Sequence, residues 1–354
     1  MRRALVLARR GWGRTAPNPL VGAVVVRAGQ VVGEGFHAEF GGPHAEVVAL
    51  ARAGERARGA EMFVTLEPCT HHGRTPPCTD ALIAAGVRRV IVAVPDPNPV
   101  AAGGIEKLRA AGIAVTEGVE RAAAEDLNAP FLFAQREEGR PFVTLKLAIS
   151  LDGALASADR SQRWLTGERA RRHVHHLRAG VDAVGVGIGT ALADDPDLTV
   201  RSGRRPRIAP CRVVFDPGTR LPPLNKLVRT AGKVPTWVLA DAPDPARRAA
   251  LERAGVRVLQ ANGLGAQLGL LRAEGVRHLL VEGGAGMAGA LLSGGVVDRL
   301  IIFHAPVLLG AGALPAFGSV SLATGFPERW RVVERRAFDD DLMTVYATVP
   351  SAGR

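Results

Sequence analysis

The feature that most constrains this chain is a His-Ala-Glu element at residues 44–46, followed by Pro-Cys elements at residues 68–69 and 77–78. His44, Cys69 and Cys78 are ligand types that zinc prefers, and a catalytic zinc uses three protein ligands and keeps a fourth position for water. Water on such a metal has a pKa of about 7 instead of about 15.7, so hydroxide is available at neutral pH. Glu46 could carry its proton to a departing amine. The pattern predicts a hydrolytic zinc site.

The loop between the two cysteines departs from the general motif. Zinc-dependent nucleobase deaminases carry H-x-E and then P-C-x-x-C, whereas here residues 70–77 separate the cysteines. This loop contains Pro and Gly and can fold back tightly. A closed structural zinc with His71 or His72 as the fourth ligand is the alternative, and it would leave Glu46 without a role.

Local patterns predict how the chain delivers these ligands. Residues 61–67 are expected to form a strand leading to the first cysteine, residues 79–85 a helix after the second, and residues 43–52 a helix beginning beside the histidine. Helix N-termini carry partial positive charge that favours thiolate, the form of cysteine that binds metal.

The length of 354 residues favours two domains, each able to bury its own core. Apolar runs of strand character alternate with amphipathic helices throughout, which predicts an α/β fold in both halves. Residues 137–141 form a polar stretch rich in chain breakers. We therefore expect one domain at residues 1–139 and a second at residues 140–354.

The patterns also predict most of the regular elements. In the first domain, the remaining expected elements are helices at 2–10, 105–111 and up to about 136, and strands at 20–26, 31–35, 90–94 and 113–116. In the second, strands are expected at 142–147, 183–187, 212–216, 236–240, 256–259, 278–281, 299–303 and 345–349, and helices at 168–178, 245–254 and 287–293.

Two glycine-rich elements follow strands in the second domain. Residues 185–190 (GVGIGT) do not have the G-x-G-x-x-G spacing, so a Rossmann dinucleotide site is not predicted. Residues 282–286 (EGGAG) lie between a strand and a helix, where backbone N–H groups and the helix dipole can hold a phosphate.

The net charge of +11 is concentrated in the second domain, since residues 140–354 carry 29 basic and 19 acidic side chains. Such a surplus fits a phosphorylated ligand, and an arginine-rich genome composition would produce it equally well. A nucleic-acid binder would interleave aromatic side chains with its basic residues. Aromatic residues make up only 5% of the chain, so no nucleic-acid partner is expected.

Three cysteines make no disulfide framework and suit a reducing compartment, so we expect a cytoplasmic protein. The apolar run after Met1 is short and ends at Arg9 and Arg10, which favours an amphipathic helix over a signal peptide. Charged residues, Pro and Gly interrupt the apolar stretch around residues 300–314 well short of a membrane span.

Beyond the zinc motif, longer stretches of the sequence carry a family resemblance. They are residues 17–22 (PNPLVG), 43–46 (PHAE), 65–78 (TLEPCTHHGRTPPC) and 96–99 (DPNP) in the first half, and 145–147 (LKL), 150–153 (SLDG), 164–166 (WLT), 193–196 (ADDP), 198–201 (LTVR) and 282–284 (EGG) in the second. Over nearly its whole length the chain resembles the bifunctional deaminase-reductases of bacterial riboflavin biosynthesis. The long loop between the cysteines is that family's own spacing.

The resemblance implies a cytidine-deaminase-like α/β/α domain followed by a dihydrofolate-reductase-like α/β domain. It implies hydrolytic deamination of 2,5-diamino-6-ribosylamino-4(3H)-pyrimidinone 5′-phosphate and then reduction of the ribosyl group, giving 5-amino-6-ribitylamino-uracil 5′-phosphate. Zn²⁺ and NADPH would be the cofactors, and a homo-oligomer is the family expectation.

The resemblance also assigns residues. Those implied in substrate binding are Asn18, Lys146, Gln162, Arg178, Leu198, Arg201 and Glu282. Those implied in NADPH binding are Ala148, Trp164, Thr190, Asp194, Gly284, Ala285 and Gly286. Residues 100–104 depart from the family pattern, being one residue shorter and lacking its arginine.

Two other functions compete with this interpretation. A nucleoside or tRNA-base deaminase with an unrelated appended domain would act on cytidine or adenosine and ignore NADPH. A basic nucleic-acid-binding protein with a structural zinc would show steeply salt-dependent binding and would tolerate Glu46→Gln.

Overall fold

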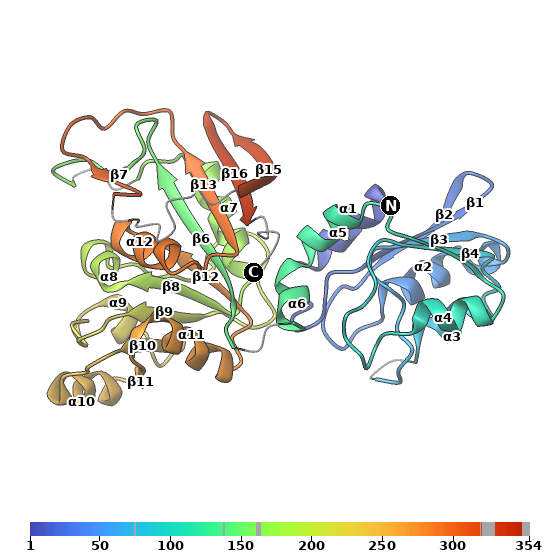
Figure 1. Cartoon of the computed structure of the whole chain (residues 1–354), viewed down its shortest axis with the longest axis horizontal. Coiled ribbons are helices and arrows are strands. Elements are labelled where there is room, and N and C mark those ends of the chain that lie inside the picture. Colours follow the sequence, from blue (N-terminus) through green and yellow to red (C-terminus); the bar gives the residue numbers. More distant parts are fainter. Residues whose placement is uncertain (74–75, 137–138, 161–163, 319, 321–329, 349–354) are drawn as a thin grey trace. The chain divides into compact units, whose positions relative to one another are not determined.

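The computed structural model describes residues 1–73, 76–136, 139–160, 164–318, 320 and 330–348 (Figure 1). The chain divides into two compact units, residues 1–136 and 137–354. Each unit is built on a sheet flanked by helices, which confirms the predicted α/β class. Among the helices of the described residues, none has both the length and the apolar character needed to cross a membrane.

The first unit is organised around a five-stranded sheet with the order β2-β1-β3-β4-β5. Its strands are β1 (Gly22–Arg27), β2 (Gln30–Phe36), β3 (Glu61–Val64), β4 (Arg89–Val92) and β5 (Ala114–Glu117). β1 is antiparallel to β2 and β3, whereas β3, β4 and β5 are parallel. The helices are α1 (Arg2–Ala8), α2 (Ala45–Ala53), α3 (Cys78–Ala84), α4 (Gly104–Ala110), α5 (Arg121–Leu127) and α6 (Ala129–Ala134), with 3₁₀ turns at Arg9–Gly11 and Gly54–Ala57.

Two glycines of β2 allow α2 to lie directly on the sheet. A Cβ atom at Gly33 would stand 2.3 Å from the carbonyl oxygen of Ala49, and one at Gly35 would stand 2.2 Å from that of Ala45. Only glycine permits backbones to approach this closely. The position of the first turn of α2, just after His44, is therefore set by packing against the sheet.

The helix expected to run to residue 136 is divided into α5 and α6 at Asn128. The side chain of Asn128 accepts a hydrogen bond from the Leu20 backbone N–H at 2.8 Å and donates one to the Leu20 carbonyl at 2.9 Å. Pro130 also favours a helix start, because its ring lacks the N–H that an interior position must donate. Leu20 is far from Asn128 in the sequence, so no local pattern predicted this contact or the division of the helix.

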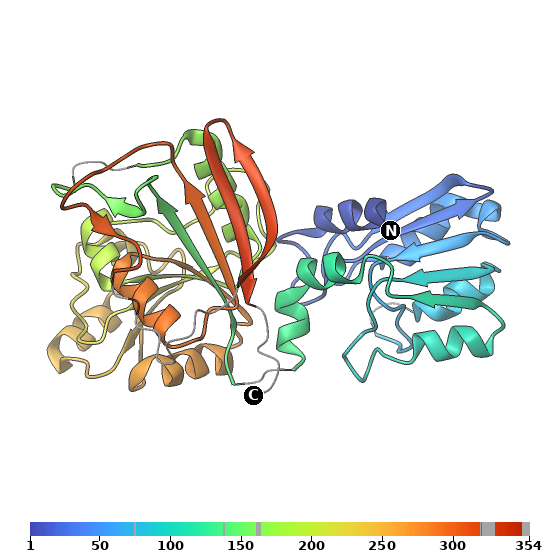
Figure 2. The same ribbon diagram turned by 45° about the horizontal axis from the view of Figure 1, so that its top comes forward.

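The second unit contains a nine-stranded sheet with the order β11-β10-β9-β8-β12-β6-β13-β16-β15 (Figure 2). Its strands are β6 (Phe142–Ile149), β8 (Ala183–Gly187), β9 (Cys211–Phe215), β10 (Thr236–Ala240), β11 (Arg257–Gln260), β12 (His278–Glu282), β13 (Arg299–His304), β15 (Trp330–Phe338) and β16 (Asp341–Thr348). The pairs from β11 to β13 are parallel, and β16 is antiparallel to both β13 and β15. A separate small sheet pairs β7 (Ala154–Ala156) with β14 (Leu314–Pro315). The helices are α7 (Glu168–Ala179), α8 (Ile188–Asp194), α9 (Lys226–Arg229), α10 (Pro245–Arg253), α11 (Gly263–Ala273) and α12 (Ala285–Ser293).

The parallel strands are apolar on both faces because helices cover both. Val213 and Leu279 belong to one buried cluster, while their chain neighbours Val214 and Leu280 belong to another. Successive side chains of a strand point to opposite faces, so the two clusters lie on either side of the sheet. This explains why the sequence showed continuous apolar runs instead of alternation.

The sequence patterns did not predict β7, β14, β15, α8, α9 and α11. β15 has a register irregularity between Val332 and Glu334 that disturbs its alternation, and most of its residues are exposed or partly exposed at the sheet edge. α11 carries glycines within it, which hid its helical character. α8 begins inside the glycine-rich stretch 185–190, where the glycines hid its helical character.

Candidate active sites

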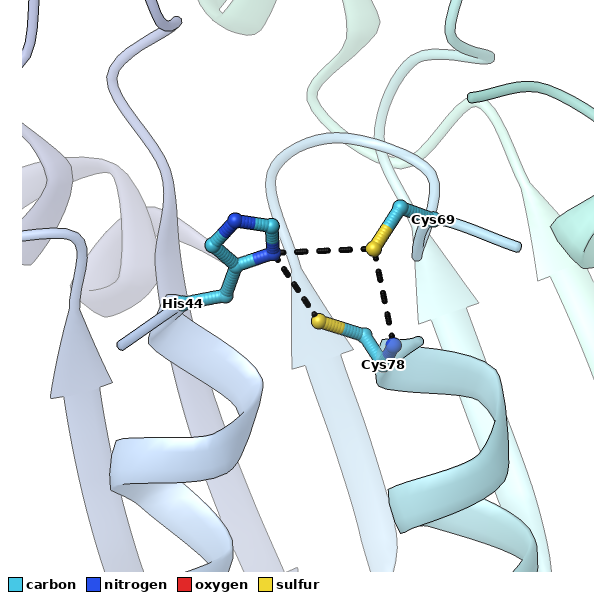
Figure 3. Close-up of side chains that lie close together, drawn as sticks. All are labelled: His44, Cys69 and Cys78. Atoms are coloured by element: carbon cyan, nitrogen blue, oxygen red, sulfur yellow. Dashed lines mark hydrogen bonds between the residues drawn. The ribbon is translucent and has the colours of Figure 1, made fainter. Parts of the chain in front are cut away.

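The three predicted zinc ligands meet at one point in the first unit (Figure 3). His44 is the residue before α2, Cys69 follows β3, and Cys78 opens α3. Their ligand atoms all lie within 4.8 Å of one another. His44 Nδ1 is 3.2 Å from the Cys78 sulfur and 3.6 Å from the Cys69 sulfur, and the Cys78 backbone N–H points at the Cys69 sulfur at 3.5 Å.

These donors fit a zinc ion. Tetrahedral zinc bonds of about 2.0–2.3 Å hold neighbouring ligand atoms about 3.3–3.8 Å apart, close to the separations found. Hydrogen bonds from Cys78 and His44 lower the pKa of Cys69 to about 4, while the hydrogen bond to Cys69, together with burial, raises the pKa of Cys78. One thiolate is thus favoured before any metal binds. The group holds three residues, and His71 and His72 are not part of it.

The segment that carries Cys69 is held in place by Glu67. Its carboxylate accepts hydrogen bonds from the backbone N–H groups of Asp96 and Ile105, each at 3.0 Å. A Cβ atom at Gly104 would lie 1.9 Å from the Pro68 carbonyl oxygen, so the start of α4 rests directly against the same segment. No sequence motif predicted this role for Glu67. Its position immediately before Pro68 and Cys69 is the feature of the sequence that could have indicated it.

Glu46 lies in the first turn of α2 and is 3% exposed. Burial raises its pKa to about 7, partly opposed by a hydrogen bond to its own backbone, by the nearby His44 and by a hydrogen bond with Cys78. A carboxyl group with such a pKa can both accept and release a proton near neutral pH. Position and protonation both suit proton transfer beside the three ligands.

Asn18 is connected to the metal-ligand segment through His37. The Asn18 amide nitrogen lies 3.1 Å from His37 Nε2, and His37 Nδ1 lies 3.1 Å from the Pro43 carbonyl oxygen. Since that carbonyl can only accept, Nδ1 donates to it and Nε2 of the neutral ring accepts from Asn18. Burial lowers the pKa of His37, in keeping with a neutral ring. These hydrogen bonds connect Asn18 through His37 to Pro43, the residue that precedes the ligand His44.

In the second unit, Lys146, Arg178 and Glu282 come together. Lys146 on β6 stands opposite Glu282 on β12, and Arg178 reaches from α7. Arg178 donates to both oxygens of Glu282, at 2.5 and 2.9 Å, and to the Thr199 carbonyl at 2.9 Å. Burial acts to raise the pKa of Glu282, but the charge and hydrogen bonds of Arg178 together with the charges of Lys146 and His175 outweigh it, so the pKa is lowered. Burial lowers the pKa of Lys146.

The other residues implied in substrate binding differ in their exposure. Leu198 is 3% exposed, packs in the apolar core and has a left-handed backbone, with φ at 53°. Arg201 is exposed, pairs with Asp197 and lines a cavity of about 490 Å³ together with Arg205 and Ser202. Gln162 lies outside the described residues.

The residues implied in NADPH binding lie at or near the carboxyl ends of β6, β8 and β12. Ala148 is near the end of β6, Thr190 is in α8, and Gly284 to Gly286 open α12. A Cβ atom at Gly284 would lie 2.8 Å from the Thr190 hydroxyl oxygen. The exposed backbone at the start of α12 fits a phosphate group. Ligands of open parallel sheets bind at this edge, so the start of α12 is a suitable place for a cofactor phosphate.

Two of the implied cofactor residues lie farther out. Asp194 closes α8 and is exposed. Trp164 is 57% exposed, with the Arg171 guanidinium 5.5 Å from its ring centre. An exposed indole is available to contact a ligand, and the structure gives Trp164 no buried core role.

Comparison with known families agrees with both sites. The cytidine and deoxycytidylate deaminase zinc-binding region matches residues 1–94, which contain His44, Glu46, Cys69 and Cys78. The RibD C-terminal domain matches residues 141–344. The fold and the sites thus define a zinc-binding deaminase region joined to a reductase domain.

Whole-chain relatives show the same arrangement. Riboflavin biosynthesis protein RibD of Aquifex aeolicus is 43% identical over 343 residues, covering 96% of this chain and 95% of that protein. The RibD of Escherichia coli is 45% identical over 330 residues, covering 88% of each. A crystal structure from Thermotoga maritima, described as a diaminohydroxyphosphoribosylaminopyrimidine deaminase/5-amino-6-(5-phosphoribosylamino)uracil reductase, matches with a TM-score of 0.83 and 35% identity, covering 99% of this chain and 97% of that one.

The chain belongs to the RibD family of riboflavin biosynthesis proteins. It is a bifunctional enzyme with a deaminase and a reductase activity, and zinc and NADPH are its cofactors. The resemblance noted in the sequence and the dihydrofolate-reductase-like class expected for the second half are confirmed.

Proposed function

We propose that residues 1–139 deaminate 2,5-diamino-6-ribosylamino-4(3H)-pyrimidinone 5′-phosphate and that residues 140–354 reduce the ribosyl group of the product, giving 5-amino-6-ribitylamino-uracil 5′-phosphate. The observation that carries the first assignment is the meeting of His44, Cys69 and Cys78 beside buried Glu46. The reductase assignment is supported by the cluster of Lys146, Arg178 and Glu282 at the carboxyl edge of the sheet.

In the deamination, His44, Cys69 and Cys78 would hold zinc, with the Nδ1 atom of His44 facing the two sulfurs. When bound, zinc supplies Lewis acidity and makes a water nucleophile available at neutral pH. Glu46 accepts a proton from the attacking water and delivers it to the amino group that leaves as ammonia. Asn18, oriented by His37, binds the pyrimidine.

In the reduction, NADPH supplies the hydride. The backbone of Gly284, Ala285 and Gly286 binds a cofactor phosphate, while Ala148, Trp164, Thr190 and Asp194 line the rest of that site. Hydride adds to the ribose carbon bonded to nitrogen as the bond from that carbon to the ring oxygen breaks, and the released oxygen takes up a proton. Lys146 is the group we propose to hold it, because burial lowers its pKa and so eases proton release from Nζ.

Binding of the phosphorylated sugar would involve the charged residues around this point. Glu282 accepts hydrogen bonds from sugar hydroxyls, and Arg178 fixes its carboxylate in one orientation. Arg201 contributes a guanidinium for the phosphate. Leu198 supports the substrate site through its packed position beside Thr199, whose carbonyl accepts a hydrogen bond from Arg178. Gln162 is assigned to substrate binding from the family motif alone.

The proposed substrate is a small molecule, so no nucleic acid is needed as a partner. We further propose a cytoplasmic location, supported by three cysteines that are all unpaired, and assembly as a homo-oligomer. Equilibrium sedimentation of the purified chain tests the last point, and a mass equal to one chain would exclude it.

The test of the central proposal is mass spectrometry of the diaminopyrimidine ribosyl phosphate after incubation with the full chain. Without NADPH, only replacement of an amino group by oxygen is expected. With NADPH, the same product gains two hydrogens. Cytidine and adenosine serve as controls and should remain unchanged; absence of deamination with zinc present would refute the proposed substrate.

A further inference from the structure

The segment that follows β13 has almost no apolar anchor of its own. From residue 306 to residue 315 every side chain is exposed or only partly buried, with Leu308 73% exposed. The loop that follows β6 is similar, since Ala154 is the only buried residue described between residues 151 and 160. Apart from Leu155, which packs against the core, and buried Ala154, the described residues of these segments have few apolar contacts, so polar contacts contribute strongly to their positions.

Asp152 supplies the densest set of those contacts. Its carboxylate accepts hydrogen bonds from the Gly310 backbone N–H at 2.8 Å, from the Leu309 N–H at 3.2 Å, and from the Ser150 hydroxyl at 2.5 Å. These hydrogen bonds lower the pKa of Asp152 to about 2, so the carboxylate is ionised throughout the neutral range. Ser150 itself is fully buried and gives the carboxylate a fixed partner.

Further backbone bonds run along the same two segments. The Leu151 N–H donates to the Val307 carbonyl and the Ala305 N–H to the Ile149 carbonyl, each at 2.8 Å, and the Ala316 N–H donates to the Gly153 carbonyl at 3.0 Å. β7 and β14 then pair. In Figures 1 and 2 the chain after β13 accordingly runs beside the chain after β6. The Asp152 side chain joins residues 309–310, between these points, to the loop after β6.

This connection lies at the cofactor edge of the sheet. β6 and β13 are neighbouring parallel strands, and Ala148 stands opposite Phe303. The segment that Asp152 anchors begins directly after β6, whose residue Ala148 is proposed to contact NADPH. A change at Asp152 would therefore alter the backbone that follows Ala148.

We propose that Asp152 is a positioning residue of the reductase half, which docks residues 305–316 against residues 149–156 and so fixes the backbone beside Ala148 for NADPH binding. This inference rests on the proposed cofactor site. It assigns Asp152 no contact with substrate or cofactor. Its effect is expected in cofactor affinity, with much less change in turnover at saturating NADPH.

The experiment compares the full-length wild type with Asp152→Asn, Asp152→Glu and Asp159→Asn. Asparagine presents an N–H group where the carboxylate accepted N–H groups, whereas glutamate keeps the acceptor. Asp159 accepts a matching hydrogen bond from Ser157 in the same loop, at 2.6 Å, and is the control for loss of an acidic charge. The measurements are the Kd and KM for NADPH, kcat, hydrogen exchange of peptides covering residues 305–316, and deaminase activity.

For Asp152→Asn we expect the Kd and KM for NADPH to rise about tenfold, on the scale of a lost charge-assisted hydrogen bond, with kcat within about threefold of wild type. Exchange should become faster in residues 305–316, and deaminase activity should not change. Asp152→Glu should recover at least part of the affinity, and Asp159→Asn should match the wild type.

An NADPH affinity of Asp152→Asn equal to that of the wild type would overturn the inference, as would unchanged exchange at residues 305–316. If Asp152→Asn fails to fold, Ser150→Ala decides the matter, because it removes only one partner of the carboxylate and should raise the Kd by about threefold. Failure of the wild type to bind NADPH would instead refute the proposed cofactor site, so the two outcomes are distinct.

Discussion

The zinc-type site takes its ligands from residues 44–78 and brings them within 4.8 Å of one another, whereas the candidate reductase residues are spread from Lys146 to Gly286 over β6, β12, α7, α8 and α12. The first is held by close backbone packing, with Gly35 against α2 and Gly104 against Pro68. The second depends on the register of neighbouring strands and on polar ties such as Arg178–Glu282. The comparison shows that one chain can build one site from local packing and another from long-range alignment.

Removal of a metal ligand should have the largest effect and should be confined to the first site. Cys69→Ala leaves two donors, too few to hold a catalytic zinc. We expect zinc to be lost and deamination to become undetectable, with reduction of the already deaminated substrate unchanged. Metal analysis and separate assays of the two reactions check this, and loss of both activities would mean that the sites are not independent.

Glu46→Gln should separate zinc binding from catalysis within the first site. Glutamine has nearly the same shape but cannot shuttle a proton, so deaminase kcat should fall by about 10²–10⁴-fold. Zinc content should remain at the wild-type level, because Glu46 is not one of the three grouped ligands. Deamination at near wild-type rate would argue for a structural metal.

Arg178→Met probes the long-range construction of the second site. The Arg178 and Glu282 side chains are only 11% and 16% exposed, and removal of one partner leaves a buried charge. We expect a loss of about 3–5 kcal/mol in stability of the second unit together with a loss of reductase activity. Urea unfolding followed by hydrogen exchange of β12 peptides measures the first effect, while deaminase activity should persist below the new transition.

Low pH should weaken the second unit through His278, which is 9% exposed and whose pKa is lowered to about 3 by burial and by the nearby Arg299. The unfolded chain, with a histidine pKa of about 6.5, binds a proton that the folded chain excludes between these two values. Stability therefore falls as pH falls from about 6.5 to about 3, by up to about 1.4 kcal/mol per pH unit for this group.

His278→Asn tests that dependence, because asparagine does not titrate and can still hydrogen-bond to Thr144, which lies 2.9 Å from the histidine ring. The pH slope of unfolding should become shallower in the variant, with little change at pH values above about 7. His173, whose pKa burial lowers to about 4, and His175 and His176, whose pKa values burial also lowers, contribute to the slope that remains. An unchanged slope would show that His278 is protonated in the folded chain.

The difference between the two sites also governs what the sequence could predict. His44, Glu46, Cys69 and Cys78 follow a short motif whose spacing determines their chemistry, and the structure groups the three ligands as expected. Lys146, Arg178 and Glu282 could be named only through family resemblance, since no local pattern indicates that residues so far apart in sequence will meet. The contacts of Asp152 with residues 309–310 were invisible for the same reason.

Several elements escaped prediction because tertiary contacts outweighed local preference. Asn128 divides a helix through its bonds to Leu20, and the irregularity in β15 hides its strand character. The buried packing and left-handed backbone of Leu198, whose assignment to the substrate site stays a prediction, were likewise not indicated by its motif. Such positions need the folded structure, because their conformation is determined by distant partners.

The glycine at position 35 has a consequence for how this enzyme can change over time. Gly35 belongs to β2, a strand that supplies no ligand. A single added methyl group there would collide with the carbonyl oxygen of Ala45, the residue that follows His44, and would push α2 away from the sheet. Evolution can therefore replace Gly35 only at the cost of moving the metal ligands, although Gly35 is not itself part of the active site.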